Sequence, residues 1–261
     1  MSNSKINIRQ IALPTEHGSW GFVLEPLVLA LLVAYSFPGL MIALCTFFMF
    51  LSHQPIKIIF KKNNRKSYNK IVIIVLCIYF LFITAFFSIT FFNVALVKLI
   101  PFGLSLIVMA NYLANLYKQK NRELISELSA PISISLIALC IVLFKGWQIE
   151  YVIAFWIILL ARSIPTTFYV HTKLLLFKKK ESKNTLPLIS VYIFTGILLW
   201  TSMLGFTPYL TVAASLILLA RTHLGIFYSK GNFKVVKFGI IEFVYGGLYI
   251  LVTAFGYIYS I

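Results

Sequence analysis

The amino-acid sequence predicts an all-α protein, a polytopic integral membrane bundle of about nine transmembrane helices. Three observations lead to this fold class. Hydrophobic residues make up 60% of the 261 residues and charged residues only 11%, whereas about 25% of the residues of a soluble domain are charged. Apolar runs of membrane-crossing length follow one another through the chain, and the segments between them are short and basic.

An apolar run of roughly 17 to 25 residues crosses a bilayer as a helix. Short turns rich in glycine and proline separate several of the runs, at Phe37-Pro38-Gly39, Lys145-Gly146-Trp147 and Gly205-Phe206-Thr207-Pro208, and they predict tight hairpins. The nine predicted spans cover residues 19–36, 39–58, 71–91, 94–117, 124–144, 148–176, 186–204, 208–228 and 237–259.

The distribution of lysine and arginine predicts the orientation. All seven acidic residues are glutamates, and the net charge is +16. Nearly all basic residues fall before the first span or after the even-numbered spans, and only Lys98 and Lys145 lie clearly on the other side. Because cytoplasmic loops carry the excess of basic residues, we expect the N-terminus in the cytoplasm and the C-terminus outside. This charge indicates orientation in a membrane and not nucleic-acid binding.

The chain is predicted to form one transmembrane domain, residues 1–261, with a short cytoplasmic N-terminal segment, residues 1–17, and an uncleaved first span. An internal repeat supports the hairpin arrangement. The segment Leu159-Leu160-Ala161-Arg162-Ser163 recurs as Leu218-Leu219-Ala220-Arg221-Thr222, at an offset of 59 residues. Two spans and their connections fill that interval, so consecutive hairpins bring equivalent helices to the same side.

The few ionisable residues of the spans concentrate near the helix ends that adjoin the basic loops. Burying such groups in a bilayer is costly, so they persist mainly where they meet partners, a cavity or a ligand. The sequence therefore predicts a cytoplasm-facing polar and cationic cavity. Its candidate ligand-binding residues are Glu16, His17, Glu25, His53, Glu123, Glu127, Arg162, Tyr169, His171, Arg221, His223 and Glu242.

Helical spacing gives some of these residues a common face. Arg162 and Tyr169 lie seven residues apart on one stripe, and His171 falls about half a turn away from Arg162. Glu242 shares a face with Gly246, and small residues let helices approach closely, so we expect Glu242 to contact another helix, at the entrance of the first span.

Structural roles remain open beside the functional ones. Glu25 is either a site residue or a carboxyl bonded to a neighbouring helix. The arginines either line the cavity or extend into the headgroup layer. Glu123 and Glu127, four residues apart, repel each other unless a base lies near, which favours ion pairing over acid–base catalysis. The four histidines either converge or bond locally, and none has metal-binding spacing, so no metal site is predicted.

The segment Pro14 to Pro26, PTEHGSWGFVLEP, resembles the opening motif of the YwiC-like family of bacterial membrane proteins. Two glycines and two prolines predict a bent or half-inserted entry into the first span. The resemblance implies a location in the bacterial cell membrane.

A second, more distant resemblance concerns the architecture. Nine spans with polar clusters after spans two and six look like the UbiA-type prenyltransferase superfamily, whose aspartate motifs at those places hold magnesium and a prenyl diphosphate. Here the two places read Ser52-His53-Gln54-Pro55 and Arg162-Ser163-Ile164-Pro165, without an acidic residue. Magnesium prefers carboxylate oxygens, so diphosphate chemistry has no metal holder there.

Three functions follow from these observations. The first is the binding of an anionic lipid, isoprenoid or quinone-type ligand from the bilayer, with or without enzymatic activity and with an unknown cofactor. The second is a transporter or permease for a small solute, favoured by repeated hairpins and by an interrupted first span. The third is a non-catalytic membrane component of respiratory assembly. Nucleotide-binding and nucleophile motifs do not occur in the sequence.

Overall fold

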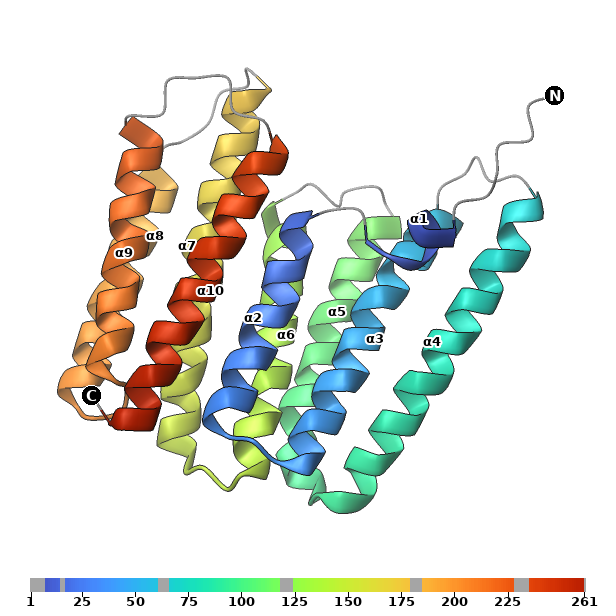
Figure 1. Cartoon of the computed structure of the whole chain (residues 1–261), viewed down its shortest axis with the longest axis horizontal. Coiled ribbons are helices and arrows are strands. Elements are labelled where there is room, and N and C mark those ends of the chain that lie inside the picture. The colour runs from blue at the N-terminus through green and yellow to red at the C-terminus, as the bar shows by residue number, and fades with distance from the viewer. Residues whose placement is uncertain are drawn as a thin grey trace.

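The computed structural model of the chain describes residues 8–14, 17–60, 66–117, 124–178, 185–227 and 235–260. Within these ranges every regular element is a helix (Figure 1). The helices are α1 (Ile8–Ala12), α2 (His17–Val33), α3 (Phe37–Phe60), α4 (Lys66–Asn93), η1 (Leu96–Leu99), α5 (Ile100–Tyr117), α6 (Leu124–Phe144), α7 (Ile149–Phe177), α8 (Thr185–Met203), α9 (Tyr209–Phe227) and α10 (Val235–Tyr259).

The predicted polytopic bundle is confirmed, and each predicted span corresponds to a helix. Eight helices, α3 to α10, are long and apolar enough to cross a membrane, η1 extending α5. The first span is shorter, since α2 contains an apolar stretch from Trp20 to Val33. The short helix α1 was not predicted from the sequence. It lies at the end of the bundle that carries the basic connections, and the end of α10 lies at the opposite end (Figure 1).

Two of the predicted turns close with the same backbone motif. Gly146 and Gly205 adopt positive φ angles of 87° and 77°, a conformation that glycine adopts at little cost. Gly146 N donates to Leu143 O over 3.0 Å, and Trp147 N donates to Val142 O over 3.3 Å. Gly205 and the residue after it bond in the same way. These paired bonds form a Schellman motif, which ends one helix and reverses the chain tightly.

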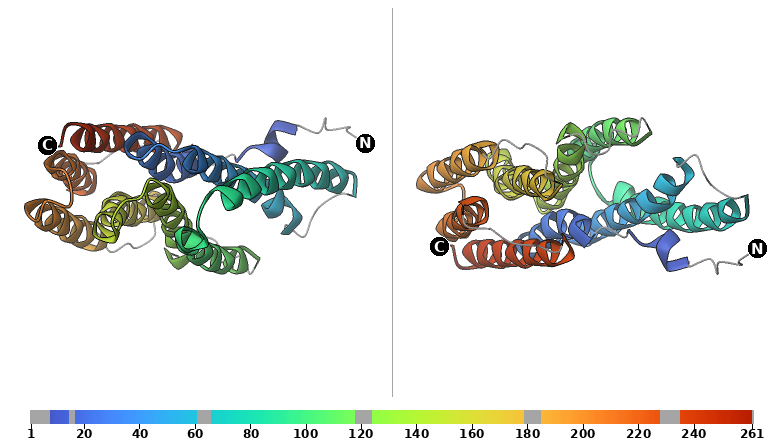
Figure 2. Two further views of the ribbon diagram at one scale, coloured as in Figure 1. Left: turned by 90° about the horizontal axis from the view of Figure 1, so that it is seen from below. Right: turned by 90° about the horizontal axis from the view of Figure 1, so that it is seen from above.

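The helices stand in two rows (Figure 2). One row contains α10, α2, α3 and α4, and the other contains α8, α7, α6 and α5. Helix α9 packs on both α8 and α10 and so joins the rows at one end. Helix α6 packs on α2, α3, α5 and α7 and links the rows in the middle. Helix α2, which contains the first span, packs on the last helix, α10, so the two lie side by side.

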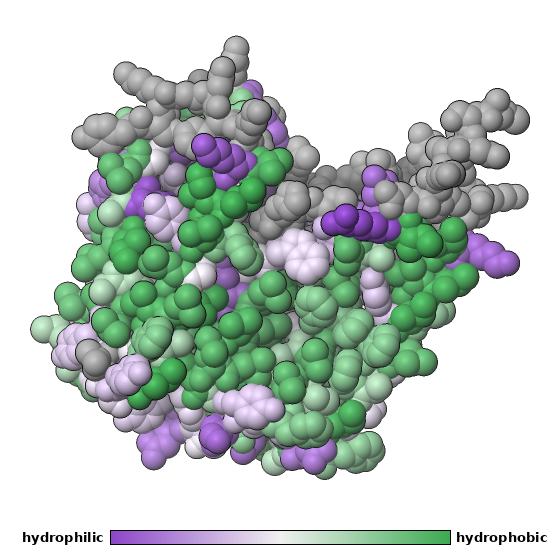
Figure 3. All heavy atoms as spheres, viewed as in Figure 1, coloured by the Kyte–Doolittle hydropathy of each residue, from purple (hydrophilic) through white to green (hydrophobic). Residues whose placement is uncertain are grey.

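Burial differs strongly between the helices and indicates which of them contact lipid. In the apolar windows of α6 and α7, 67% and 61% of the residues are buried inside the bundle, against 6% in α4. Helix α4 is also the most apolar, with a mean hydropathy of 2.8. The side faces of the bundle are largely hydrophobic, as Figure 3 shows for one of them. Such faces suit a hydrocarbon environment.

The predicted interruption of the first span is wrong. Helix α2 runs from His17 to Val33 without a break, with Pro26 inside it. Pro165 likewise lies inside a continuous α7. A proline removes one backbone donor from a helix, and packed neighbours make this tolerable in a membrane.

Candidate functional site

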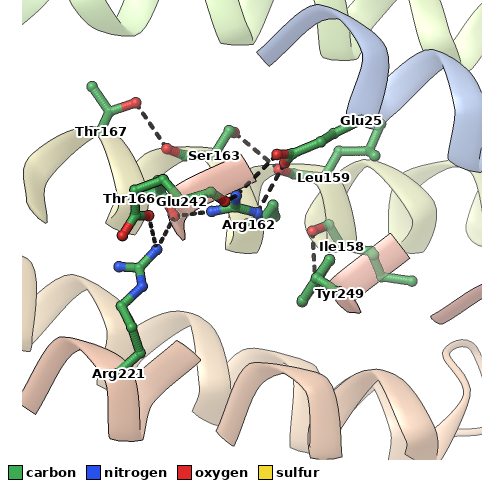
Figure 4. A network of polar contacts seen from close by, with 10 residues as sticks. All are labelled: Glu25, Ile158, Leu159, Arg162, Ser163, Thr166, Thr167, Arg221, Glu242 and Tyr249. Atoms are coloured by element: carbon green, nitrogen blue, oxygen red, sulfur yellow. Dashed lines mark hydrogen bonds and ion pairs between the residues drawn. The ribbon is translucent and has the colours of Figure 1, made fainter. Parts of the chain in front are cut away.

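Four ionisable side chains from four helices meet inside the bundle (Figure 4). We call them the ion-paired centre: Glu25 of α2, Arg162 of α7, Arg221 of α9 and Glu242 of α10. Each is buried, with only 6% to 8% of its surface exposed. The sequence placed all four among its candidate residues, and the structure brings them together from opposite ends of the chain.

Arg162 makes the most contacts in the centre. Its Nε lies 2.9 Å from Glu25 Oε2, and its Nη2 donates to Glu25 Oε1 over 3.0 Å. The same Nη2 donates to the backbone carbonyl of Glu242 over 3.1 Å, and Nη1 donates to Thr166 Oγ1. Of the two contacts with Glu25, only that of Nη2 has hydrogen-bond geometry, and the buried Nε has no hydrogen-bond partner among the described residues. The pair is therefore close but not the parallel two-bond form of an arginine–carboxylate pair. Arg162 thus ties α7 to both α2 and α10.

Arg221 forms the second ion pair. Its Nη2 lies 2.5 Å from Glu242 Oε2 and 3.3 Å from Thr166 Oγ1, to which it also donates. The guanidinium stands over the ring of Tyr169, 4.5 Å from the centroid, and 5.6 Å from that of Tyr245. Arginine is attracted to aromatic faces at such distances. The predicted site residue Tyr169 is therefore part of the wall around the centre.

The centre holds two positive and two negative side chains, so their formal charges cancel. A lone charge inside a bilayer is costly, and each of these charges has a counter-charge within hydrogen-bonding distance. Removing one partner of such a buried pair leaves the other uncompensated, which is far more destabilising than losing a surface pair. The arrangement explains why arginines at this depth do not extend to the headgroups.

The depth of the centre differs from the prediction. Glu25 is the ninth of the 17 residues of α2, and Arg162 lies near the middle of the 29-residue α7. These side chains are near mid-helix and not at the helix ends beside the basic loops. Mutual pairing makes the deeper position possible, because neither arginine needs water to satisfy its charge.

Two glycines leave room for the Glu25 carboxylate. A Cβ at Gly246 of α10 would overlap with Glu25 Oε1 and lie 2.7 Å from Arg162 Nη2. A Cβ at Gly21 of α2 would lie 2.9 Å from Glu25 Oε1. Helices α2 and α10 can therefore close around the carboxylate only because both positions lack a side chain.

Small cavities adjoin the centre. One of about 60 Å³ lies between α2, α7 and α10, and its lining includes Glu25, Arg162, Thr166 and Glu242. Another of about 10 Å³ lies against Glu25, Arg162 and Tyr249. Figure 3 shows hydrophilic atoms at mid-height in the seam between α10 and α2, on an otherwise apolar face. The cavities near the centre have room for waters or a small head group.

The remaining candidate residues lie apart from the centre. His171 Nδ1 is 2.6 Å from Glu127 Oε2, which pairs α7 with α6. Glu127 therefore has a histidine partner in the structure. Because His171 faces α6 while Arg162 faces α2 and α10, the two do occupy different faces of α7.

Two more histidines bond locally. His53 Nε2 is 2.9 Å from the Tyr112 hydroxyl, and His223 Nε2 is 3.0 Å from the Tyr192 hydroxyl. Glu16, Glu123 and the side chain of His17 lie outside the described residues. The described part of the chain contains no group of His, Cys or Glu residues arranged to hold a metal ion.

Sequence reasoning missed three residues of this region: Thr166, Tyr245 and Tyr249. Thr166 lies four residues after Arg162, the spacing at which helix side chains meet, and this signal was available. Tyr245 and Tyr249 share the face of α10 that carries Glu242 and Gly246.

Comparison with known proteins gives a family and no closer relative. No curated protein sequence and no solved structure matches the chain. The family model of the YwiC-like protein matches residues 13–142. This region begins just before α2, contains Glu25 and ends in the last turn of α6. The match places the chain among membrane proteins of the YwiC-like family, to which it belongs.

Proposed function

We propose that the chain is a single-domain, multi-pass protein of the bacterial cell membrane that binds an amphiphile with an anionic head at the ion-paired centre. The amphiphile is an anionic lipid or an isoprenoid. The basic connections are cytoplasmic, so the N-terminus lies inside and the C-terminus outside.

One observation carries this proposal. Two arginines from different helices converge on one neutral hydroxyl, that of Thr166. The hydroxyl accepts a hydrogen bond from each guanidinium but carries no charge. An anion beside Thr166 would therefore contact both guanidiniums, one on each side. In addition, the Nε atoms of Arg162 and Arg221 are both buried and have no hydrogen-bond partner among the described residues. A buried donor without a partner is costly, and an anionic oxygen satisfies it.

Entry from the bilayer is supported by the seam between α2 and α10. The 60 Å³ cavity is lined there by Phe22, Phe238 and Phe243 beside the charged residues. An amphiphile would place its apolar chain along these faces and its head among the arginines. A phosphate or carboxylate offers Arg162 two acceptor oxygens spaced to match its guanidinium fork. When the head replaces Glu25, the released carboxylate takes up a proton and the centre stays neutral.

The experiment is to purify the protein in a mild detergent, extract bound lipid and identify it by mass spectrometry. We expect one class of anionic amphiphile with the natural chain and its loss with Arg162→Ala. Glu127→Gln is the matched control, because it breaks an ion pair of the bundle outside the centre. Absence of any anionic amphiphile from the natural chain, or equal amounts with Arg162→Ala, would contradict the proposal.

A further inference from the structure

Helix α10 carries a stripe of polar and small residues that runs from the ion-paired centre to the opposite end of the helix. The α10 stripe consists of Glu242, Gly246, Tyr249, Thr253 and Tyr257. Spacings of three and four residues keep its members on one helix face, and the 15 helical steps from Glu242 to Tyr257 span about 22 Å. Leu251 and Phe255, on another face of α10, are more than half exposed.

The outer end of the stripe opens into a pocket. This cavity of about 420 Å³ lies at the end of the bundle away from the basic connections, between the two Schellman turns and the end of α10. Tyr257 lines it together with Trp147, Tyr151, Thr207 and other residues of these turns. The lining contains polar hydroxyls and no ionisable carboxylate, amine or guanidinium among the described residues. Its chemistry suits water better than an ion.

The inner end of the stripe reaches the centre. The Tyr249 hydroxyl donates to the carbonyl of Ile158 on α7 over 3.0 Å. Tyr249 also lines the 10 Å³ cavity beside Glu25 and Arg162, which is about the space that one water needs. Tyr249 therefore lies at the centre and Tyr257 at the pocket, eight residues apart on one face of α10.

Two hydroxyls of the α10 stripe lack hydrogen-bond partners. For comparison, the buried hydroxyls of Thr222 on α9 and Thr167 on α7 each donate to the carbonyl four residues earlier in their helix. In contrast, the buried hydroxyls of Thr253 and Tyr257 have no hydrogen-bond partner among the described residues. An unpaired hydroxyl in an apolar interior is costly. Water bound between buried polar groups satisfies such hydroxyls elsewhere in proteins.

We propose that the α10 stripe forms a hydrated route from the outer pocket to the ion-paired centre. Water enters at Tyr257, passes Thr253 and Tyr249, and reaches Glu25. Hydroxyls both donate and accept, so each can pass a proton along the line. On the proposed function, in which a ligand displaces Glu25 from Arg162, this route supplies the proton that Glu25 takes up. Hydration of the route does not depend on the amphiphile, which approaches through the seam between α2 and α10.

Cysteine accessibility tests the route without any ligand. The three native cysteines are replaced by alanine, and single cysteines are introduced as Tyr257→Cys, Thr253→Cys and Phe255→Cys. Ag⁺ is added to the outer side of sealed membranes, and thiols that remain free are then labelled with a maleimide after unfolding. Phe255 is the matched control, since it lies between the other two along α10 but is 51% exposed on the lipid face.

We expect Tyr257→Cys and Thr253→Cys to react at least about tenfold faster than Phe255→Cys, because only a thiol in contact with water ionises and reacts. Tyr249→Cys serves as a second probe if Thr253→Cys fails to fold, which labelling and elution in detergent reveal, because Tyr249 lines the cavity beside Glu25. Rates for Thr253→Cys or Tyr249→Cys no higher than for Phe255→Cys would overturn the route. This outcome would leave lipid binding at Arg162 unaffected, so the two proposals fail separately.

Discussion

Arg162 Nε lies 2.9 Å from Glu25 Oε2, although the two residues are 137 positions apart in the chain. The contact fastens the second half of the bundle to its first span, and the match to the YwiC-like family covers only the first half. The fixed position of α2 between α6 and α10 therefore depends in part on a residue outside the matched region.

The first prediction concerns the stability that this contact provides. Arg162→Gln should lower the free energy of unfolding in detergent micelles by about 3 kcal/mol, because Glu25 would remain buried without a counter-charge. His171→Gln is the comparison, since its ion pair with Glu127 is more exposed, at 23% and 27% of the two side chains, and should cost about 1 kcal/mol or less.

A double-mutant cycle separates the pair from general damage. Arg162→Gln combined with Glu25→Gln should be less destabilised than the sum of the two single variants, with a coupling energy of about 1 to 3 kcal/mol. Denaturant unfolding followed by tryptophan fluorescence measures all three variants. Simple additivity would show that the ion pair makes no specific contribution.

The second prediction compares two adjacent glycines of α10. Gly246→Ala should destabilise the protein by about 2 kcal/mol, because its methyl group would overlap the Glu25 carboxylate. Gly247→Ala should have no such cost, since a Cβ there meets nothing within 4 Å. Thermal unfolding in the same detergent gives both values, and equal melting temperatures would refute the close packing of α2 on α10.

Much of the fold could be predicted from the sequence, because membrane spans are encoded locally by apolar runs and turns. The repeated arginines were also visible: Arg162 and Arg221 occupy equivalent positions on α7 and α9, and both point to one centre. The partners of each group could not be predicted. Whether Glu127 meets an arginine or His171 depends on which helix packs beside α6, and no local pattern determines the order of helices in a bundle.

The depth of the centre illustrates the same limit. Sequence position alone suggested that the charged residues lie near the basic loops. In the structure Glu25 and Arg162 lie near the middle of α2 and α7, whereas Arg221 and Glu242 lie nearer the ends of α9 and α10 that adjoin the basic connections. The four side chains neutralise one another, and this pairing makes the burial of their charges acceptable. The three described histidine side chains, by contrast, bond to separate neighbours and form no common site.

The third prediction tests the bond that links Tyr249 to α7. Tyr249→Phe removes the donor to the Ile158 carbonyl and should reduce the unfolding free energy by about 1 kcal/mol. Tyr259→Phe is the control on the same helix, because Tyr259 is 63% exposed and its hydroxyl has no contact in the bundle interior. A loss of the same size in both variants would show that Tyr249 has no special role.

The fourth prediction concerns orientation in the membrane. A reporter enzyme that folds only outside the cytoplasm should be active when fused after the end of α10 and inactive when fused in the basic connection between α3 and α4. Activity assays of the two fusions in intact cells decide the matter. The reverse pattern would place the basic connections outside and invert the topology.

Binding of an isoprenyl phosphate tests whether the ion-paired centre holds an anionic head. The measurement is the affinity of the purified protein for geranylgeranyl phosphate, with geranylgeraniol, which lacks the phosphate, and phosphatidylglycerol as comparison ligands. We expect one of the two anionic ligands to bind at least about tenfold more tightly than geranylgeraniol, and we expect Arg162→Gln and Arg221→Gln each to abolish this preference while Glu127→Gln keeps it. Equal affinities for charged and uncharged ligands, or a preference unchanged in both arginine variants, would contradict the proposed function.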